Sequence, residues 1–251
     1  MGPAGQAIPY CGPPPTSAEL FAQWNLDPLI LGPLLLGLAV VAVTARRLPA
    51  SRIRAAGLAL FTLAIAFVSP MCALSSALFA ARTVHHILLI CVAAPLIVLA
   101  LPRPPRQGFP VVLIATVLQA AVLWFWHAPA LYEAALSNHG VYAVMEITLL
   151  ASAVLFWGAI RAATPPTAAL ALVLTMVQTG MLGALLVFAG SAVYGPHLLT
   201  TAAWGLTPLQ DQQLAGLIMW APAAGVYLAT ALVLVARWIG PDPAVVERQP
   251  A

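Results

Sequence analysis

The chain has 251 residues, of which 62% are hydrophobic and 7% are charged, and its mean hydropathy is +0.98. In a soluble domain about a quarter of the residues are charged, so this composition indicates a polytopic membrane protein. The length leaves no room for a separate catalytic domain. All ten basic residues are arginine, and no basic stripe with interleaved aromatic residues suggests a nucleic-acid partner.

The first predicted element is a segment rich in proline and glycine. Residues 1–26 carry no basic residue and lack the regions of a signal peptide, so we expect a loop outside the bilayer, with insertion directed by the first helix. Apolar runs near the roughly 20 residues that cross a bilayer then follow at about 28–45, 55–70, 84–102, 109–126, 140–160, 167–190 and 213–236. We predict an all-α, polytopic seven-transmembrane helix bundle over residues 27–238, followed by a cytoplasmic tail over residues 239–251.

The arginines predict how this bundle is oriented. Nine of the ten fall at one end of a seven-helix arrangement, namely Arg46, Arg47, Arg52, Arg54, Arg103, Arg106, Arg161, Arg237 and Arg248. The positive-inside rule makes that end cytoplasmic, which places the N-terminus outside and the C-terminus inside. Arg82 is then the only basic residue in the outer half.

Histidines gather at the other end. All five are expected in the outer half, as His85, His86, His127, His139 and His197. With a rise of ~1.5 Å per residue, His86, His127, Glu146 and Met219 lie between roughly 22 and 27 Å from the inner boundary. We therefore predict one layer, just beneath the outer interface, that handles a metal ion or protons.

The adjacent histidines raise a question of direction. His85 and His86 are about 100° apart on a helix, so they are not expected to face one small site together. We choose His86 as the ligand or proton relay, because it lies deeper, and His85 as a packing or interfacial residue. Cys91 is predicted to point elsewhere as a buried apolar thiol, and Cys11 and Cys72 have no metal-site spacing.

Two further polar groups stand in apolar helices. In Trp124-Phe-Trp-His127 the tryptophans are expected to form an interfacial belt. His127 could be interfacial too, or could turn one ring nitrogen inward while a carbonyl holds the other, as in metal-binding histidines. Glu146 is a functional candidate, because a carboxylate inside the bilayer is costly. Its partner could be Arg82, a histidine, a metal or a proton.

The last helix opens with Asp211, which we expect to cap it. Gln212, Gly216 and Met219 follow at i, i+4 and i+7 and so share a face. A thioether is a soft donor that suits Cu(I), and imidazole suits copper too, although a lone methionine more often packs. Gly183 on the preceding helix favours close helix contact.

Motifs of common catalytic sites are absent from the sequence. The sequence has no GxSxG, HExxH or Walker loop and no paired carboxylates on one helix, so we predict that the protein is not an enzyme. Metal binding, haem ligation by His86 and His127, or a subunit role in a larger complex remain open.

Several of these segments together resemble the CtaG family of cytochrome c oxidase assembly factors, the type associated with caa3 oxidases. The resemblance is carried by His86-Ile-Leu-Leu, Ala94-Pro-Leu, Trp126-His-Ala-Pro129 and, most specifically, Asp211-Gln-Gln-Leu-Ala-Gly-Leu-Ile-Met-Trp220. It runs from about Trp24 through Trp238. The family often has histidines where this chain has Arg82 and Ile147.

The resemblance implies a multi-pass protein of the bacterial plasma membrane that is needed to make active haem–copper oxidase, as a chaperone that assists copper delivery on the outer side. The implied partners are oxidase subunits, a periplasmic copper donor protein and the lipid membrane. We expect copper, as Cu(I), at His86, His127, Met219, Glu146 and His85. Supporting roles are expected for Asp211, Gln212, Trp126, Trp220 and Arg82. The alternatives are an integral accessory subunit of a terminal oxidase and a membrane haem-binding protein.

Overall fold

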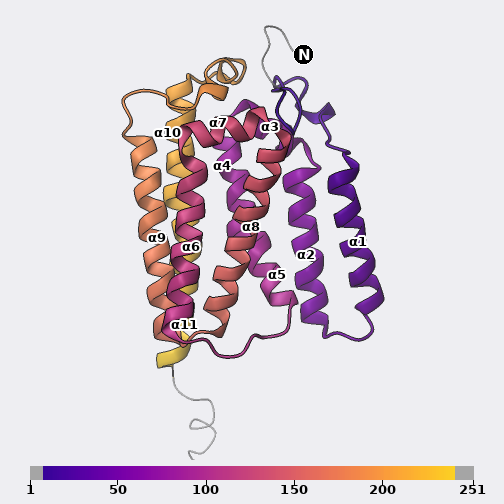
Figure 1. The fold of residues 1–251 in the computed structure, drawn as a ribbon, viewed down its shortest axis with the longest axis vertical. Coiled ribbons are helices and arrows are strands. Elements are labelled where there is room, and N and C mark those ends of the chain that lie inside the picture. Colours follow the sequence, from indigo (N-terminus) through magenta and orange to yellow (C-terminus); the bar gives the residue numbers. More distant parts are fainter. Residues whose placement is uncertain (1–7, 241–251) are drawn as a thin grey trace, which may run out of the picture.

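The computed structural model describes residues 8–240, and within that range the chain is helical without strands. Figure 1 shows the long helices side by side as a bundle. Six helical segments are long and apolar enough to cross a membrane: Ala50–Phe67, Phe79–Ala100, Phe109–His127, His139–Ala162, Pro165–Val187 and Pro208–Ile239. The all-α membrane fold is thereby confirmed. The seventh span and the orientation of the termini stay predictions, and the tail from residue 241 and the first seven residues lie outside the described residues.

The α-helices follow one another in the order of the predicted runs. They are α1 (Pro28–Thr44), α2 (Ala50–Phe67), α3 (Pro70–Ala77), α4 (Phe79–Ile87), α5 (Ala94–Ala100), α6 (Phe109–His127), α7 (Pro129–Ser137), α8 (His139–Ala162), α9 (Pro165–Val187), α10 (Pro208–Ile218) and α11 (Ala224–Ile239). Shorter turns are η1 (Leu20–Ala22), η2 (Leu88–Ala93), η3 (Gly195–His197), η4 (Thr201–Trp204) and η5 (Met219–Ala223). Of these, η2 and η5 are π-helical and join α4 to α5 and α10 to α11.

Helix starts are set by proline and by polar caps. Proline fits the first helical turn, because an N–H at that position would have no acceptor within the helix. Proline occupies this turn in α1, α3, α6, α7, α9 and α10. The Asn138 side chain caps α8 by accepting from two backbone N–H groups. Thr207 and Gln210 form a capping box at α10, so the prediction that Asp211 caps this helix is wrong.

A proline also explains the first π turn. In η2, the N–H of Ala94 bonds to the carbonyl of Leu89, five residues back. The next donor in that pattern would be Pro95, which has no N–H, so the carbonyl of Ile90 needs another partner. Trp157 on α8 supplies it, with its Nε1 donating to the Ile90 oxygen at 2.8 Å. This bond ties α8 to the bent helix.

The two ends of the bundle differ in structure. At the end that carries His139, the short helix α7 lies across the helix tips, and the N-terminal segment returns over α3 (Figure 1). A disulfide between Cys11 and Cys72 holds this segment in place. The opposite end consists of connections between helices, among them the α1–α2 and α5–α6 segments, which carry arginines, and the α8–α9 connection, which follows Arg161 in the last turn of α8.

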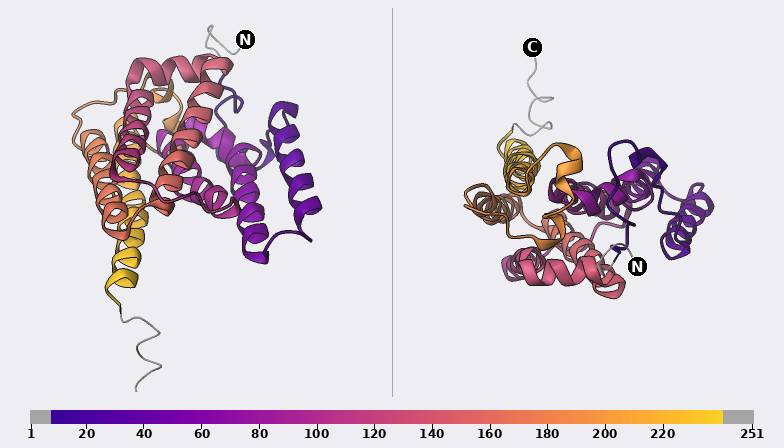
Figure 2. Two further views of the ribbon diagram at one scale, coloured as in Figure 1. Left: turned by 60° about the horizontal axis from the view of Figure 1, so that its bottom comes forward. Right: turned by 90° about the horizontal axis from the view of Figure 1, so that it is seen from above.

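Helix α1 stands at the edge of the bundle, beside α2 (Figure 2). None of its residues is buried, although nearly all are apolar. A helix that is apolar all round is typical of one whose surface is covered by lipid or by protein. The core lies instead among α4, α6, α8, α9 and α10, which position the polar groups described next.

Candidate functional site

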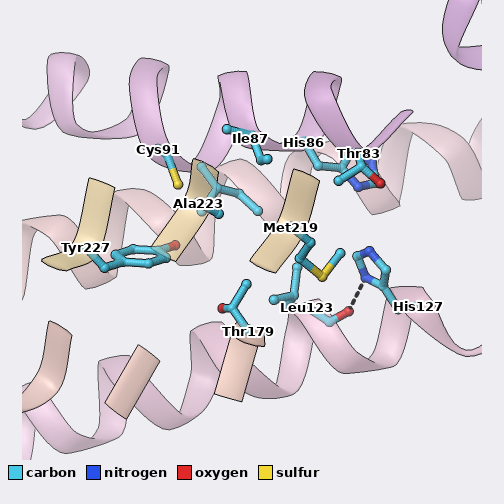
Figure 3. Close-up of a pocket in the computed structure, with 11 residues that line it drawn as sticks. Thr83, His86, Ile87, Cys91, Leu123, His127, Thr179, Met219, Ala223 and Tyr227 are labelled. Atoms are coloured by element: carbon cyan, nitrogen blue, oxygen red, sulfur yellow. Dashed lines mark hydrogen bonds between the residues drawn. The ribbon is translucent and has the colours of Figure 1, made fainter. Parts of the chain in front are cut away.

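A cavity of about 20 Å³ lies inside the bundle, and His86, His127 and Met219 are among the residues that line it (Figure 3). They come from α4, α6 and η5, which are far apart in the sequence. This volume is enough for about one water molecule or one metal ion. Three of the five predicted ligands thus meet at one place.

The His127 ring is fixed by its own helix. Its Nδ1 donates to the carbonyl oxygen of Leu123 at 2.7 Å, one turn earlier. Because a carbonyl only accepts, Nδ1 carries the proton of the neutral ring and Nε2 keeps a free lone pair. The predicted arrangement of a carbonyl-held histidine is therefore confirmed, and it is the arrangement that metal-binding histidines use.

His86 faces His127 across the cavity, with the ring centroids 5.9 Å apart. Neither ring nitrogen of His86 has a hydrogen-bond partner among the described residues, although the side chain is buried. Its Nε2 lies 3.7 Å from Oε1 of Glu146. A buried imidazole without a partner costs free energy, so this ring is suited to gain a ligand.

His85 meets the same carboxylate from the other side. Its Nε2 lies 3.6 Å from Oε2 of Glu146, and its ring packs edge-on against Phe67. We expected that His85 and His86 would not face one site together. This expectation is wrong at Glu146, because its carboxylate, which comes from α8, lies near both rings. It holds for the cavity, which His86 lines and His85 does not.

Glu146 finds its charged partner in Arg82. The Arg82 Nη1 lies 3.1 Å from Oε1 of Glu146 and also 3.1 Å from the hydroxyl of Tyr142, and the guanidinium stands over the Tyr142 ring. All three side chains are buried, so the ion pair is shielded from water. Of the partners considered for Glu146, the structure brings Arg82, His85 and His86 to it. Tyr142 was missed, because nothing local marks a tyrosine in an apolar run.

Met219 reaches the cavity through an unusually close helix contact. A Cβ on Gly216 would stand 2.6 Å from the carbonyl oxygen of Gly183, and one on Gly183 would stand 2.8 Å from that of Gly216. Only glycine allows backbones this close. The predicted contact at Gly183 is confirmed, and it sets the depth of α10. The π turn η5, with Pro222 inside it, begins at Met219.

Cys91 also lines the cavity, so the prediction that it points elsewhere is wrong. On a regular helix, a residue five positions after His86 would face away. The i→i+5 bonds of η2 add one residue to the turn and bring Cys91 round toward the face of His86. Pro95 was the available signal for this π turn.

Asp211 and Gln212 do not line the cavity, but their hydrogen bonds position the helices around it. The Asp211 carboxylate accepts from the N–H groups of Phe79 at 2.7 Å and Ala80 at 3.1 Å, so it caps α4, the helix of the histidine pair. The Gln212 side chain accepts from Val193 and donates toward the end of α9, which fixes the α9–α10 connection. Both are supporting residues by position.

Of the two tryptophans predicted to form an interfacial belt, Trp124 is half-buried and donates from Nε1 to Gln178 on α9 at 2.8 Å. Trp126 is only 5% exposed and donates from Nε1 to Thr148 on α8 at 2.9 Å, so the interfacial interpretation is wrong for it. Trp220 is 43% exposed and its indole packs over Gly180 of α9. Trp126 therefore joins α6 to α8, and Trp220 joins the last helix to α9.

The remaining histidines stand apart from the cavity. His197 is buried in η3, where its Nε2 and the Tyr132 hydroxyl are 2.6 Å apart. His139 is exposed at the start of α8, and its Nε2 contacts the Ile8 carbonyl oxygen at 3.2 Å. The five histidines thus divide between the buried site and the cap at the same end of the bundle.

The donor set limits what could bind. Among the described residues, no group of three or more His, Cys, Asp and Glu side chains is arranged to hold a metal ion. The nitrogen and sulfur donors at the cavity are the imidazoles of His86 and His127, the Met219 thioether and the Cys91 thiol, which form a soft set suited to Cu(I). Ile147 is 66% exposed on the outward face of α8, so a histidine at that position would not reach this cavity.

Comparison with known proteins identifies the family. No curated protein and no solved structure gave a significant match. The family model described as cytochrome c oxidase caa3 assembly factor (Caa3_CtaG) matches residues 35–111 and 107–240, which is most of the chain and includes His86, His127 and Met219. The chain is a multi-pass membrane protein that belongs to the Caa3_CtaG family of cytochrome c oxidase assembly factors.

Proposed function

We propose that this protein holds Cu(I) transiently between His86, His127 and Met219 and passes it to a cytochrome c oxidase subunit on the outer side of the bacterial plasma membrane. The observation that carries the proposal is that these three donors, from three separate helices, line one cavity. The ion is cargo, and we propose no catalytic step.

The chemistry of the donors supports transfer over storage. Cu(I) accepts imidazole and thioether ligands, and a site with few ligands releases its ion readily. His127 offers Nε2 because Nδ1 is held by the Leu123 carbonyl. Glu146, close to Nε2 of His86, can orient that ring as carboxylates do beside metal-binding histidines. The pairing of Glu146 with Arg82 leaves the carboxylate a supporting role in our proposal.

Two features support the outer side. The Cys11–Cys72 disulfide lies at the histidine end, and disulfides persist in oxidising compartments. Arginines dominate the opposite end, which the positive-inside rule assigns to the cytoplasm. A periplasmic copper donor protein would then reach the cap formed by α7 and the N-terminal segment.

The size of the cavity favours copper over haem. His86 and His127 are residue types that ligate haem iron, but about 20 Å³ between them holds one water-sized atom and not a porphyrin. We therefore propose the copper site in preference to a haem site.

The test is copper analysis of the purified, anaerobically reduced protein. We expect about one Cu(I) per chain in the wild type and a loss of at least about tenfold in retained copper for H86A, H127A and M219L. H139A and M181L are matched controls, because both side chains are exposed away from the cavity. Equal copper in all six proteins, or none in the wild type, would contradict the proposed site.

A second measurement separates delivery from a scaffold role. In a deletion strain, oxidase activity should be lost and should be restored by wild type and by the two control variants, and only weakly by H127A or M219L. Added copper should partly rescue the loss. Stoichiometric co-purification with the finished oxidase, with full activity from H127A and M219L, would favour an integral accessory subunit instead.

A further inference from the structure

A larger cleft opens at the opposite end of the bundle from the histidines. Its volume is about 1020 Å³, and it is lined by parts of α5, α8, α9 and α11 and by the α5–α6 segment. Figure 1 shows the ends of these helices gathered at the lower end of the bundle. We call it the inner cleft.

Four arginines surround the inner cleft: Arg103, Arg106, Arg161 and Arg237. Within residues 8–240 none of them pairs with a carboxylate, because the acidic residues of that range, Glu19, Asp27, Glu133, Glu146 and Asp211, belong to the histidine half. Arg161 donates to the carbonyls of Val98 and Leu101 at the end of α5. The guanidinium of Arg103 reaches the Arg161 carbonyl at 3.5 Å, so positive charges are concentrated at the mouth.

The walls below this mouth are apolar. They include Val98 on α5, Ile160 on α8 and Leu234 on α11, and Cys91 marks the deep end. Cys91 and Leu101 are separated by ten residues, or roughly 15 Å along a helix. That depth is about half of a bilayer's hydrocarbon core of ~30 Å. The inner cleft therefore matches one leaflet in depth.

A ligand that fills the inner cleft must contact both the arginines at its mouth and its apolar walls. A small anion would neutralise the arginines but leave the apolar walls without a partner, and an uncharged lipid would do the reverse. We propose that the inner cleft is a binding site for a phospholipid with an anionic headgroup. The phosphate lies among Arg103, Arg106 and Arg237, and an acyl chain runs along α5 and α11 toward Cys91. Charge complementarity of this kind recruits anionic lipids to the cytoplasmic leaflet.

The experiment is native mass spectrometry of the full-length protein in detergent, with phosphatidylglycerol and phosphatidylcholine of identical acyl chains added in equal amounts. The test variant is R103Q/R106Q/R237Q, whose three side chains are exposed at the mouth, while Arg161 is left to hold the end of α5. The matched control is R46Q/R47Q/R54Q, which removes the same charge from exposed positions at the same end but outside the inner cleft.

We expect the wild type and the control to retain phosphatidylglycerol about tenfold or more over phosphatidylcholine, and the test variant to lose this preference. Glycerophosphate and inorganic phosphate should compete weakly, because neither fills the apolar walls. Equal retention of both lipids by the wild type, equal loss in the two variants, or full competition by inorganic phosphate would overturn the proposal. Displacement of the lipid by an acidic segment of a co-purified oxidase subunit would also overturn it, in favour of a protein interface.

Discussion

The Arg82 guanidinium and the Glu146 carboxylate form a buried ion pair between α4 and α8, with Nη1 and Oε1 3.1 Å apart. Both side chains are away from water, so each charge depends on the other. The same carboxylate lies beside His85 and His86, so the pair also fixes the surroundings of the histidines.

Breaking this pair should be costly, whereas removing both charges should cost less. R82M and E146Q alone should each lower the free energy of unfolding by about 3–5 kcal/mol, because each strands a buried charge. The double variant R82M/E146Q should be more stable than either single variant. Thermal unfolding in detergent, followed by tryptophan fluorescence, measures the cycle. Additive losses would mean that the two charges are not coupled.

The Gly183–Gly216 contact should tolerate no side chain. G216A should lower the free energy of unfolding by about 1–3 kcal/mol through overpacking, because its Cβ would press on the Gly183 carbonyl. If the copper site is as proposed, retained copper should fall as well, since Met219 lies one turn further on. G225A is the control: its Cβ would have nothing within 4 Å, and it should be neutral or slightly stabilising.

The Cys11–Cys72 disulfide closes a long loop, with the two cysteines 61 residues apart. C11S/C72S should therefore lower the free energy of unfolding by about 2–4 kcal/mol. It also reports the orientation. Intact cells are treated with a membrane-impermeant reductant, and the thiols of the denatured chain are then counted with a maleimide. The wild type should carry three thiols after this treatment and one without it, whereas C11S/C72S should carry only that of Cys91 in both cases. A gain in thiols that requires broken cells, or three thiols in untreated cells, would place this end in the cytoplasm.

Acid should lower the stability of the cap at the histidine end of the bundle through His197. Burial lowers the pKa of His197 from 6.5 to about 3, and the positive charge of Arg82 adds to this shift. The unfolded chain therefore binds a proton below about pH 6.5 that the folded chain does not bind. The resulting stability is fully present above that pH and is lost as the pH falls toward 3, by up to ~1.4 kcal/mol per unit.

The variant H197Q should remove this contribution. Its stability difference from the wild type should shrink as the pH is lowered from 7 to 5 in thermal unfolding experiments. H139Q, at an exposed histidine of the same cap, should keep the wild-type pH dependence. An unchanged slope in H197Q would assign the acid sensitivity to other groups.

The sequence by itself determined the fold class and the positions of the membrane-spanning runs, because the length of an apolar run is a local property that the bilayer thickness selects. It also placed His86, His127, Glu146 and Met219 near one depth, because the helix rise is constant. The carbonyl that holds His127 follows from the same local geometry, since it lies one turn back on the same helix.

Only the tertiary structure decided how the helices are rotated about their axes. The π turn before Pro95 turned Cys91 into the cavity, and the glycine contact set how far Met219 enters it. Which side chain or helix end contacts a buried charge depends on these rotations. The spacing of residues along one helix therefore could not predict that Glu146 pairs with Arg82 or that the Asp211 carboxylate caps α4. These contacts formed because a few polar groups have no hydrogen-bond partner on their own helix and find one on a neighbouring helix.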